Sequence, residues 1–130
     1  MDELTKLCER TITKMNTSDA LEHIALLIDA SHDTQFERGL NRTLFLLEEL
    51  SKRDIESSVG ALIEYFRANA WAAKSHLFGS RSSWAWEQPE LQEELLTLSR
   101  AANHPGFSSL HRIRRCQILT NRANLLNSVI

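Results

Sequence analysis

Hydrophobic residues recur along this chain at steps of three and four, which is the spacing of one face of an α-helix. The first such stripe comprises Leu4, Leu7, Cys8, Ile12 and Met15. The alternating pattern of a half-buried strand is not found, and glycine and proline occur only four and two times. The pattern therefore predicts an all-α fold.

Short polar or glycine- and proline-containing breaks divide these stripes into about six helices. We expect helices over residues 4–15, 19–30, 36–52, 55–78, 89–103 and 110–129. The expected amino-terminal caps are Asp19, Asp33 or Thr34, Asp54, and Ser108 or Ser109, with Pro89 in a first turn and a left-handed Gly79 ending the fourth helix. Short connections predict a single domain of antiparallel helical hairpins, stacked as a superhelix or packed as an irregular bundle.

The tripeptide Arg-Ala-Asn occurs twice, at residues 67–69 in the fourth expected helix and at 122–124 in the sixth. One antiparallel helix separates the two, so these helices would run parallel and occupy equivalent places. Small residues such as Ala68 and Ala123 allow a neighbouring helix to approach closely, as stacked helical hairpins require. A chance match of three letters is the alternative explanation.

The segments around both tripeptides resemble the first helix of a tetratricopeptide repeat. FRANAWAAKSHLFG (66–79) and LTNRANLLNSV (119–129) each place a small residue before an Asn, and FERGLNRTLFLLEEL (36–50) resembles a second helix with Gly39 at its small position. The resemblance implies an array whose first helices line a concave groove that binds a peptide or another protein. It also implies that Asn69 and Asn124 face this groove.

Two features depart from that family. Arg122 stands where the family has an apolar residue, and the two tripeptides lie 55 residues apart, whereas the family's repeat is about 34 residues long. We therefore expect a tetratricopeptide-like array rather than strict membership of the family.

Charge is distributed unevenly along the chain. Residues 1–65 contain 7 Lys and Arg against 13 Asp and Glu, whereas residues 66–130 contain 8 against 4, and no acid follows Glu94. The basic carboxy-terminal part would attract an acidic partner or face the acidic half of the same chain. The expected partner-binding residues are the two groove-side asparagines, two tryptophans and four arginines of the basic carboxy-terminal part: Asn69, Trp84, Trp86, Arg112, Arg114, Arg115, Arg122 and Asn124.

The tryptophans and two of the arginines each suggest a specific contact. Trp84 and Trp86 flank one alanine, so on an extended chain they would point the same way, either as anchors for a partner or as a cover over the core. Arg115 and Arg122 lie two helical turns apart, a spacing at which both could hold one carboxylate.

Motifs for catalysis, cofactors or metals are not found in the sequence. The two cysteines and five histidines do not occur at metal-ligand spacing, and there is no glycine-rich phosphate loop. The HRIRR segment (111–115) would suit phosphates, but the pI of about 6.2 argues against nucleic-acid binding. Because these motifs are missing, we expect no cofactor. The two distant cysteines suggest no disulfide framework and no apolar run reaches the roughly 20 residues of a membrane span, so we expect a cytoplasmic protein.

These features favour a non-enzymatic adaptor that binds a peptide or protein partner through a helical-repeat groove and a basic carboxy-terminal helix. The alternative is an intracellular immunity protein or antitoxin that inhibits a toxin by direct binding. Because Ile130 ends the sequence without a cap, we expect the last helix to dock on a partner, a second copy or a further part of a longer protein.

Overall fold

The computed structural model describes residues 10–79 and 88–129, and within these ranges all regular structure is helical. Residues 10–14 are helical, and a 3₁₀ turn, η2, spans Phe107–Ser109. The main helices are α2 (Thr17–Asp33), α3 (Glu37–Ser51), α4 (Ser57–Phe78), α5 (Pro89–Ala102) and α6 (Arg112–Val129). The expected all-α fold is confirmed.

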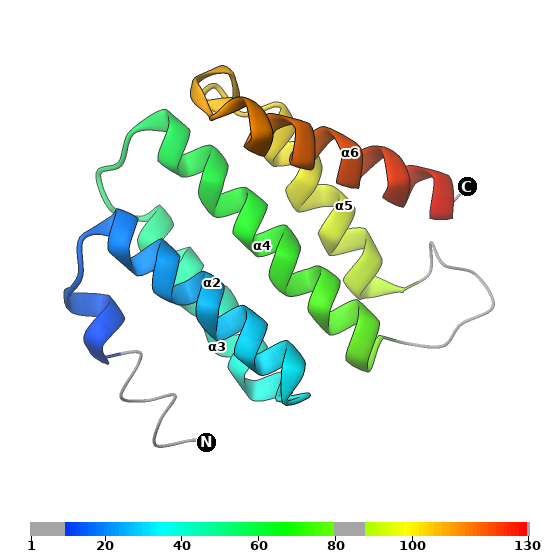
Figure 1. Ribbon diagram of the computed structural model, residues 1–130, viewed down its shortest axis with the longest axis horizontal. Helices are drawn as coiled ribbons and strands as arrows, with labels where there is room; N and C mark the ends of the chain where they lie inside the picture. Colours follow the sequence, from blue (N-terminus) through cyan, green and yellow to red (C-terminus); the bar gives the residue numbers. More distant parts are fainter. Residues whose placement is uncertain (1–9, 80–87, 130) are drawn as a thin grey trace.

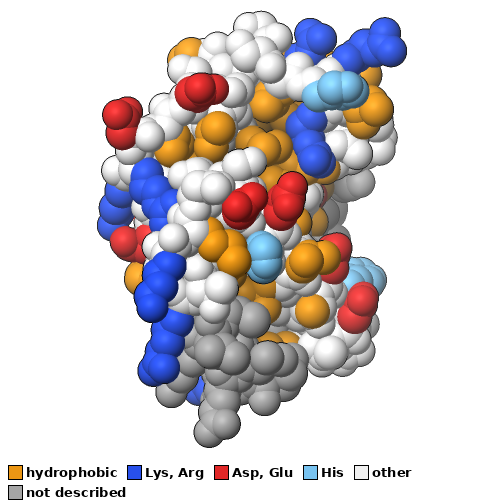
Figure 2. All heavy atoms as spheres, turned by 60° about the vertical axis from the view of Figure 1, so that its left-hand side comes forward, with side chains coloured by type: hydrophobic (Ala, Val, Ile, Leu, Met, Phe, Trp, Pro, Cys, Tyr) orange, Lys and Arg blue, Asp and Glu red, His pale blue; other side chains and the backbone are white. Residues whose placement is uncertain are grey.

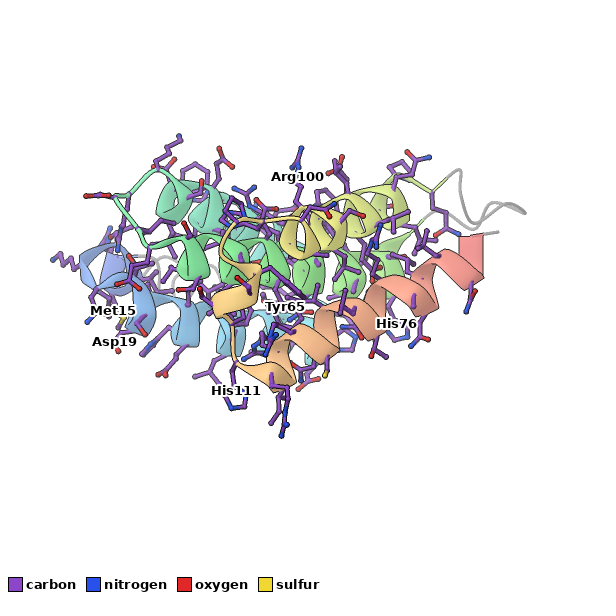
Figure 3. The ribbon with its side chains drawn as sticks, turned by 90° about the horizontal axis from the view of Figure 1, so that it is seen from above. Met15, Asp19, Tyr65, His76, Arg100 and His111 are labelled. Carbon is purple, nitrogen blue, oxygen red and sulfur yellow. The ribbon has the colours of Figure 1, made fainter. Side chains whose placement is uncertain are left out.

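The helices form two layers around α4. Figure 1 shows α2, α4 and α6 running in the same general direction, with α3 and α5 running back between them. Seen from above in Figure 3, α3 and α5 lie on one side of α4, and α2 and α6 lie on the other. The longest helix is therefore recessed between two flanking helices on one face of the molecule.

The helix ends differ from most of the expected caps. Asn16, not Asp19, caps α2, because its side-chain oxygen accepts a hydrogen bond from the Asp19 amide at 2.9 Å. The predictions for α3 and α4 were wrong, since α3 and α4 follow Phe36 and Glu56 without a side-chain cap. Thr34 instead ends α2.

Two other termini also correct the expectation. Gly79 has φ −63° and ψ 149°, which is extended backbone and not the left-handed conformation. Ser108 and Ser109 lie in η2, and the ring of His111 accepts a hydrogen bond from the Ile113 amide at 3.1 Å near the start of α6. Pro89 occupies the first turn of α5 as expected.

The main hydrophobic core fills the space between α2, α3 and α4. Its fully buried side chains include Ile24, Leu40, Leu47 and Ile63, and Leu110 and Ile118 extend it toward α6. A second, smaller cluster consists of Ala68, Leu98 and Leu125, with Leu91 and Leu95 packed against it. Burial of these side chains is the main favourable term that holds the layers together.

Glycine permits two close approaches between segments. A Cβ atom on Gly39 would lie 2.2 Å from the Ser31 hydroxyl, which confirms that this glycine is a small site between α2 and α3. A Cβ atom on Gly106 would lie 2.0 Å from the carbonyl of Ser57. Gly106 therefore allows the α5–α6 connection to rest on the first turn of α4.

Burial along α6 is uneven. Ile118 and Leu125 are buried, but Ile113 is 61% exposed, Leu119 is 48% exposed and Ala123 is also exposed. The expectation of a close helix contact at Ala123 is wrong, because among the described residues no element covers this side of α6. Ala68, by contrast, is 2% exposed, as expected for a small site between helices.

Candidate ligand-binding groove

A groove of about 940 Å³ runs between α2 and α4 on the recessed face. Figure 2 views this side of the molecule obliquely and shows hydrophobic side chains in the hollow, with acidic and basic side chains around it. The groove is lined by Ser18, Leu21, Glu22, Ala25, Leu26, Ile28, Asp29, His32, Val59, Leu62, Phe66, Asn69, Ala72, Ala73, His76 and Arg114.

The groove forms because α2 has more apolar surface than the core can cover. Leu21 and Ile28 reach both the core and the groove, whereas Leu26 is 65% exposed at the groove's edge. An apolar side chain left in water forgoes the free energy of burial, about 25 cal/mol per Å² of apolar area. The groove therefore offers apolar surface that a ligand can bury.

The floor of the groove follows a regular stripe on α4. Val59, Leu62, Phe66, Asn69 and Ala73 occur at steps of three and four and face the groove together. Asn69 is the only residue in this set with a polar side chain, and it is half-buried. The side-chain amide of Asn69 can donate hydrogen bonds to a ligand and accept hydrogen bonds from it.

The two sides of the groove differ in charge. On α2, Glu22 and Asp29 line the groove, and the sequence of this helix contains no Lys or Arg. On α6, Arg114 lines it, and the sequence of that helix contains no Asp or Glu. A ligand in the groove would therefore meet negative charge on one side and positive charge on the other.

Arg114 is held in place by contacts with α4. Its guanidinium lies 4.8 Å from the ring centroid of Tyr65 and 5.7 Å from that of Phe66, and it donates to the side-chain oxygen of Gln117 at 3.1 Å. Cation–π contacts of this kind favour one position of the side chain. The positive charge is thus fixed beside the groove floor.

A pair of histidines joins α2 to α4 at one end of the groove. Nε2 of His32 lies 3.0 Å from Nδ1 of His76, with the two rings nearly parallel at 16°. On its other side, Nδ1 of His32 lies 3.6 Å from a carboxylate oxygen of Asp33. One ring nitrogen donates and the other accepts, so this contact ties the last turns of the two helices.

Behind the floor, Arg67 anchors α4 to the opposite layer. Its guanidinium pairs with Glu64 at 3.1 Å and with Glu48 of α3, and its side chain is 14% exposed. It also donates to the hydroxyl of Ser51 at 3.4 Å. The pair with Glu64 lies within α4 and is weakly screened, because both side chains are at low exposure. The contacts with Ser51 and with Glu48, which is 56% exposed, are those that link α4 to α3.

The groove brings together only two of the expected partner-binding residues. Asn69 and Arg114 line it, whereas Arg112 and Asn124 are exposed elsewhere on α6. Trp84 and Trp86 lie outside the described residues.

Arg115 and Arg122 are directed differently from the expected carboxylate clamp. Arg122 donates from Nε to the Ser99 hydroxyl of α5 at 3.1 Å, and Nε of Arg115 is buried without a hydrogen-bond partner in the described part of the chain. Each arginine is half-buried. Their joint grip on a carboxylate stays a prediction.

Sequence reasoning missed the contribution of α2. Glu22, Leu26, Asp29 and His32 all line the groove, yet none of them was among the expected partner-binding residues. A usable signal was present, because the run IALLI at residues 24–28 is too wide for a single core-facing stripe. The histidine contact had no such signal, since His32 and His76 lie 44 residues apart.

Comparison of the chain with protein-family models, curated protein sequences and solved structures gave no match. None of the helices in the described ranges has the length and apolar character needed to cross a membrane. Over the same residues, no three His, Cys, Asp or Glu side chains are grouped to hold a metal ion.

Proposed function

We propose that this chain is a protein-interaction module that binds a peptide or protein partner in the groove between α2 and α4, with the start of α6 at its side. In this proposal the module acts as an adaptor by binding and not by catalysis. Its helices correspond to a tetratricopeptide-like array in which α2, α4 and α6 are the groove-lining first helices.

The observation that carries the proposal is the exposed apolar surface in the groove. Leu26 is 65% exposed beside Ala25, Leu62 and Phe66, and charged side chains border this surface. An apolar patch surrounded by polar residues is typical of a protein interaction site. The half-buried Asn69 on the floor adds a group that recognises amides.

Site-specific photo-crosslinking in the cell of origin tests this proposal. A benzophenone amino acid at Leu26 should capture one defined protein, because this exposed side chain lines the groove. The matched position is Leu96 on α5, which is 43% exposed and does not line the groove. Equal capture from both positions would contradict the proposal.

A pair of matched substitutions adds a second readout. Leu26→Lys should weaken binding of the captured protein at least tenfold, since it places an ammonium group on apolar surface, whereas Leu96→Lys should leave binding unchanged. Binding that survives Leu26→Lys but is lost after Arg112→Glu would instead favour the inhibitor function, in which a charged face makes the complex.

A further inference from the structure

We propose that the groove recognises an amphipathic α-helix of its partner, with basic residues along the edge that faces α2 and acidic residues along the edge that faces α6. This inference rests on the proposed function and specifies the form of the ligand. It does not depend on the partner's identity.

The apolar floor favours a helix over an extended peptide. Every residue of an extended segment brings an amide N–H and a carbonyl that need partners when they leave water. On the α4 stripe, only Asn69 and His76 have side chains able to provide hydrogen bonds, and His76 already uses Nδ1 in its contact with His32. A helix satisfies its own backbone groups and presents only side chains to the floor.

The shape of the groove also suits a helix. The stripe from Val59 to His76 extends over 17 residue steps of one straight helix, or about 26 Å, which matches a ligand helix of about 18 residues. Its neighbour α2 supplies a second ridge that runs in the same direction. Small side chains at Ala25, Ala72 and Ala73 leave room for ligand side chains to pack between the two ridges.

The charges of the two sides determine the orientation of the ligand's edges. Glu22 and Asp29 lie seven residues apart on α2, which is two helical turns, so they face the groove at similar angles. Arg114 lies across from them on α6, fixed over the rings of Tyr65 and Phe66. A ligand helix with opposite charges on its two edges would pair with both sides, whereas a uniformly charged helix would be repelled by one.

Selection from a peptide library tests this inference. The probe is a displayed library of helix-forming peptides of about 18 residues with a fixed apolar stripe, in which each edge position is Lys, Glu or Ser. Selection on the intact chain is followed by counter-selection on the folded Leu26→Lys variant. We expect enriched peptides to have Lys on one edge and Glu on the other.

Reversing the charges of α2 tests whether its acidic residues select the basic edge of the ligand. Glu22→Lys combined with Asp29→Lys should weaken the enriched peptides about tenfold at low salt and less at high salt, because exposed charges are screened. The Leu96→Lys variant serves as the control and should bind as the original chain does.

Three outcomes would overturn the inference. They are enrichment without edge polarity, enrichment only from a parallel library whose central proline prevents helix formation, and no enrichment from either library. In each case, capture of a partner through Leu26 would still support the groove as a binding site, so failure of this inference can be distinguished from failure of the proposed function.

Discussion

The two Arg-Ala-Asn tripeptides have the same sequence but different surroundings. In both copies the arginine reaches back to the preceding helix, Arg67 to Glu48 and Ser51 of α3 and Arg122 to Ser99 of α5. The alanines differ, because Ala68 is buried with Leu98 and Leu125, whereas Ala123 is exposed.

The arginine contact depends on the helix that precedes each copy, whereas burial of the alanine depends on the helix that follows it. An arginine is long enough to reach the helix before it in the chain, which every helix of a stacked array except the first possesses. Burial of the alanine requires a helix that follows, and among the described residues α6 has no such helix on that side. Two experiments test this comparison directly and two more test the helices that pack around the copies, in order from the largest expected effect.

Replacing the alanines should give the largest difference in the free energy of unfolding between the two copies. Ala68→Leu inserts a larger side chain between α4, α5 and α6 and should lower the free energy of unfolding by about 2–3 kcal/mol. Ala123→Leu on the exposed side of α6 should change it by less than about 0.5 kcal/mol. Urea unfolding followed by circular dichroism measures both, and equal losses would show that Ala123 is also packed.

Replacing the arginines should affect both copies, but unequally. Arg67→Ala leaves Glu64, whose side chain is 15% exposed, without its partner and should cost about 2 kcal/mol. Arg122→Ala removes one neutral acceptor contact, with the Ser99 hydroxyl, and should cost about 0.5–1 kcal/mol. The same unfolding measurement applies, and a larger cost at Arg122 would reverse the comparison.

The third experiment concerns Glu94 on α5, the helix that lies between the two copies in the chain. Burial raises the pKa of Glu94 from 4.5 to about 7. The folded state therefore holds the proton more tightly than the unfolded state, and the stability contributed by the protonated group is lost as the pH rises from about 4.5 to 7.

Glu94→Gln removes this ionisation and should stabilise the protein only at high pH. Because the carboxyl is partly exposed, solvent screens part of the effect, and we expect a gain of about 1 kcal/mol at pH 8 and almost none at pH 4. Melting temperatures across this range measure the difference. A gain that is equal at both pH values would contradict ionisation as its cause.

The smallest effect concerns the contact between His32 and His76, which ties α4 to α2. His76→Phe keeps an aromatic ring but removes the nitrogen that faces His32, so we expect a loss of about 0.5 kcal/mol. The matched control is His111→Phe, just before α6, which instead removes the acceptor for the Ile113 amide at a helix start. Amide exchange near residues 32 and 76 should increase only in the first variant.

The locations of the helices could be read from the sequence because apolar spacing and breaks are local signals. The steps of three and four placed α2 to α6 within a few residues, and Pro89 occupies its expected turn. The expected caps of α3 and α4 were wrong because these helices begin without a side-chain cap, and the cap of α2 was wrong because a neighbouring residue takes that role. Asn16 lies three residues before Asp19 and accepts a hydrogen bond from its backbone amide. The helix α2 therefore begins at Thr17, two residues earlier than the sequence predicted.

The groove was predicted only in part. Asn69 and Arg114 were expected from the repeated tripeptide and the basic carboxy-terminal segment, and both line it. Leu26, Glu22 and Asp29 were not expected, because a pattern on one helix does not show which apolar residues the neighbouring helices leave uncovered.

The sequence by itself determined the all-α class, the order of the helices and the small residues that permit close packing at Gly39 and Ala68. Helical periodicity and side-chain size are properties of short segments, so they can be recognised in the sequence without knowledge of the fold. Only the tertiary structure decided that Ala123 is exposed, that Arg122 turns toward Ser99, and that α2 and α6 place opposite charges beside α4. These outcomes depend on contacts between residues far apart in the chain, and burial and pairing are properties of such contacts.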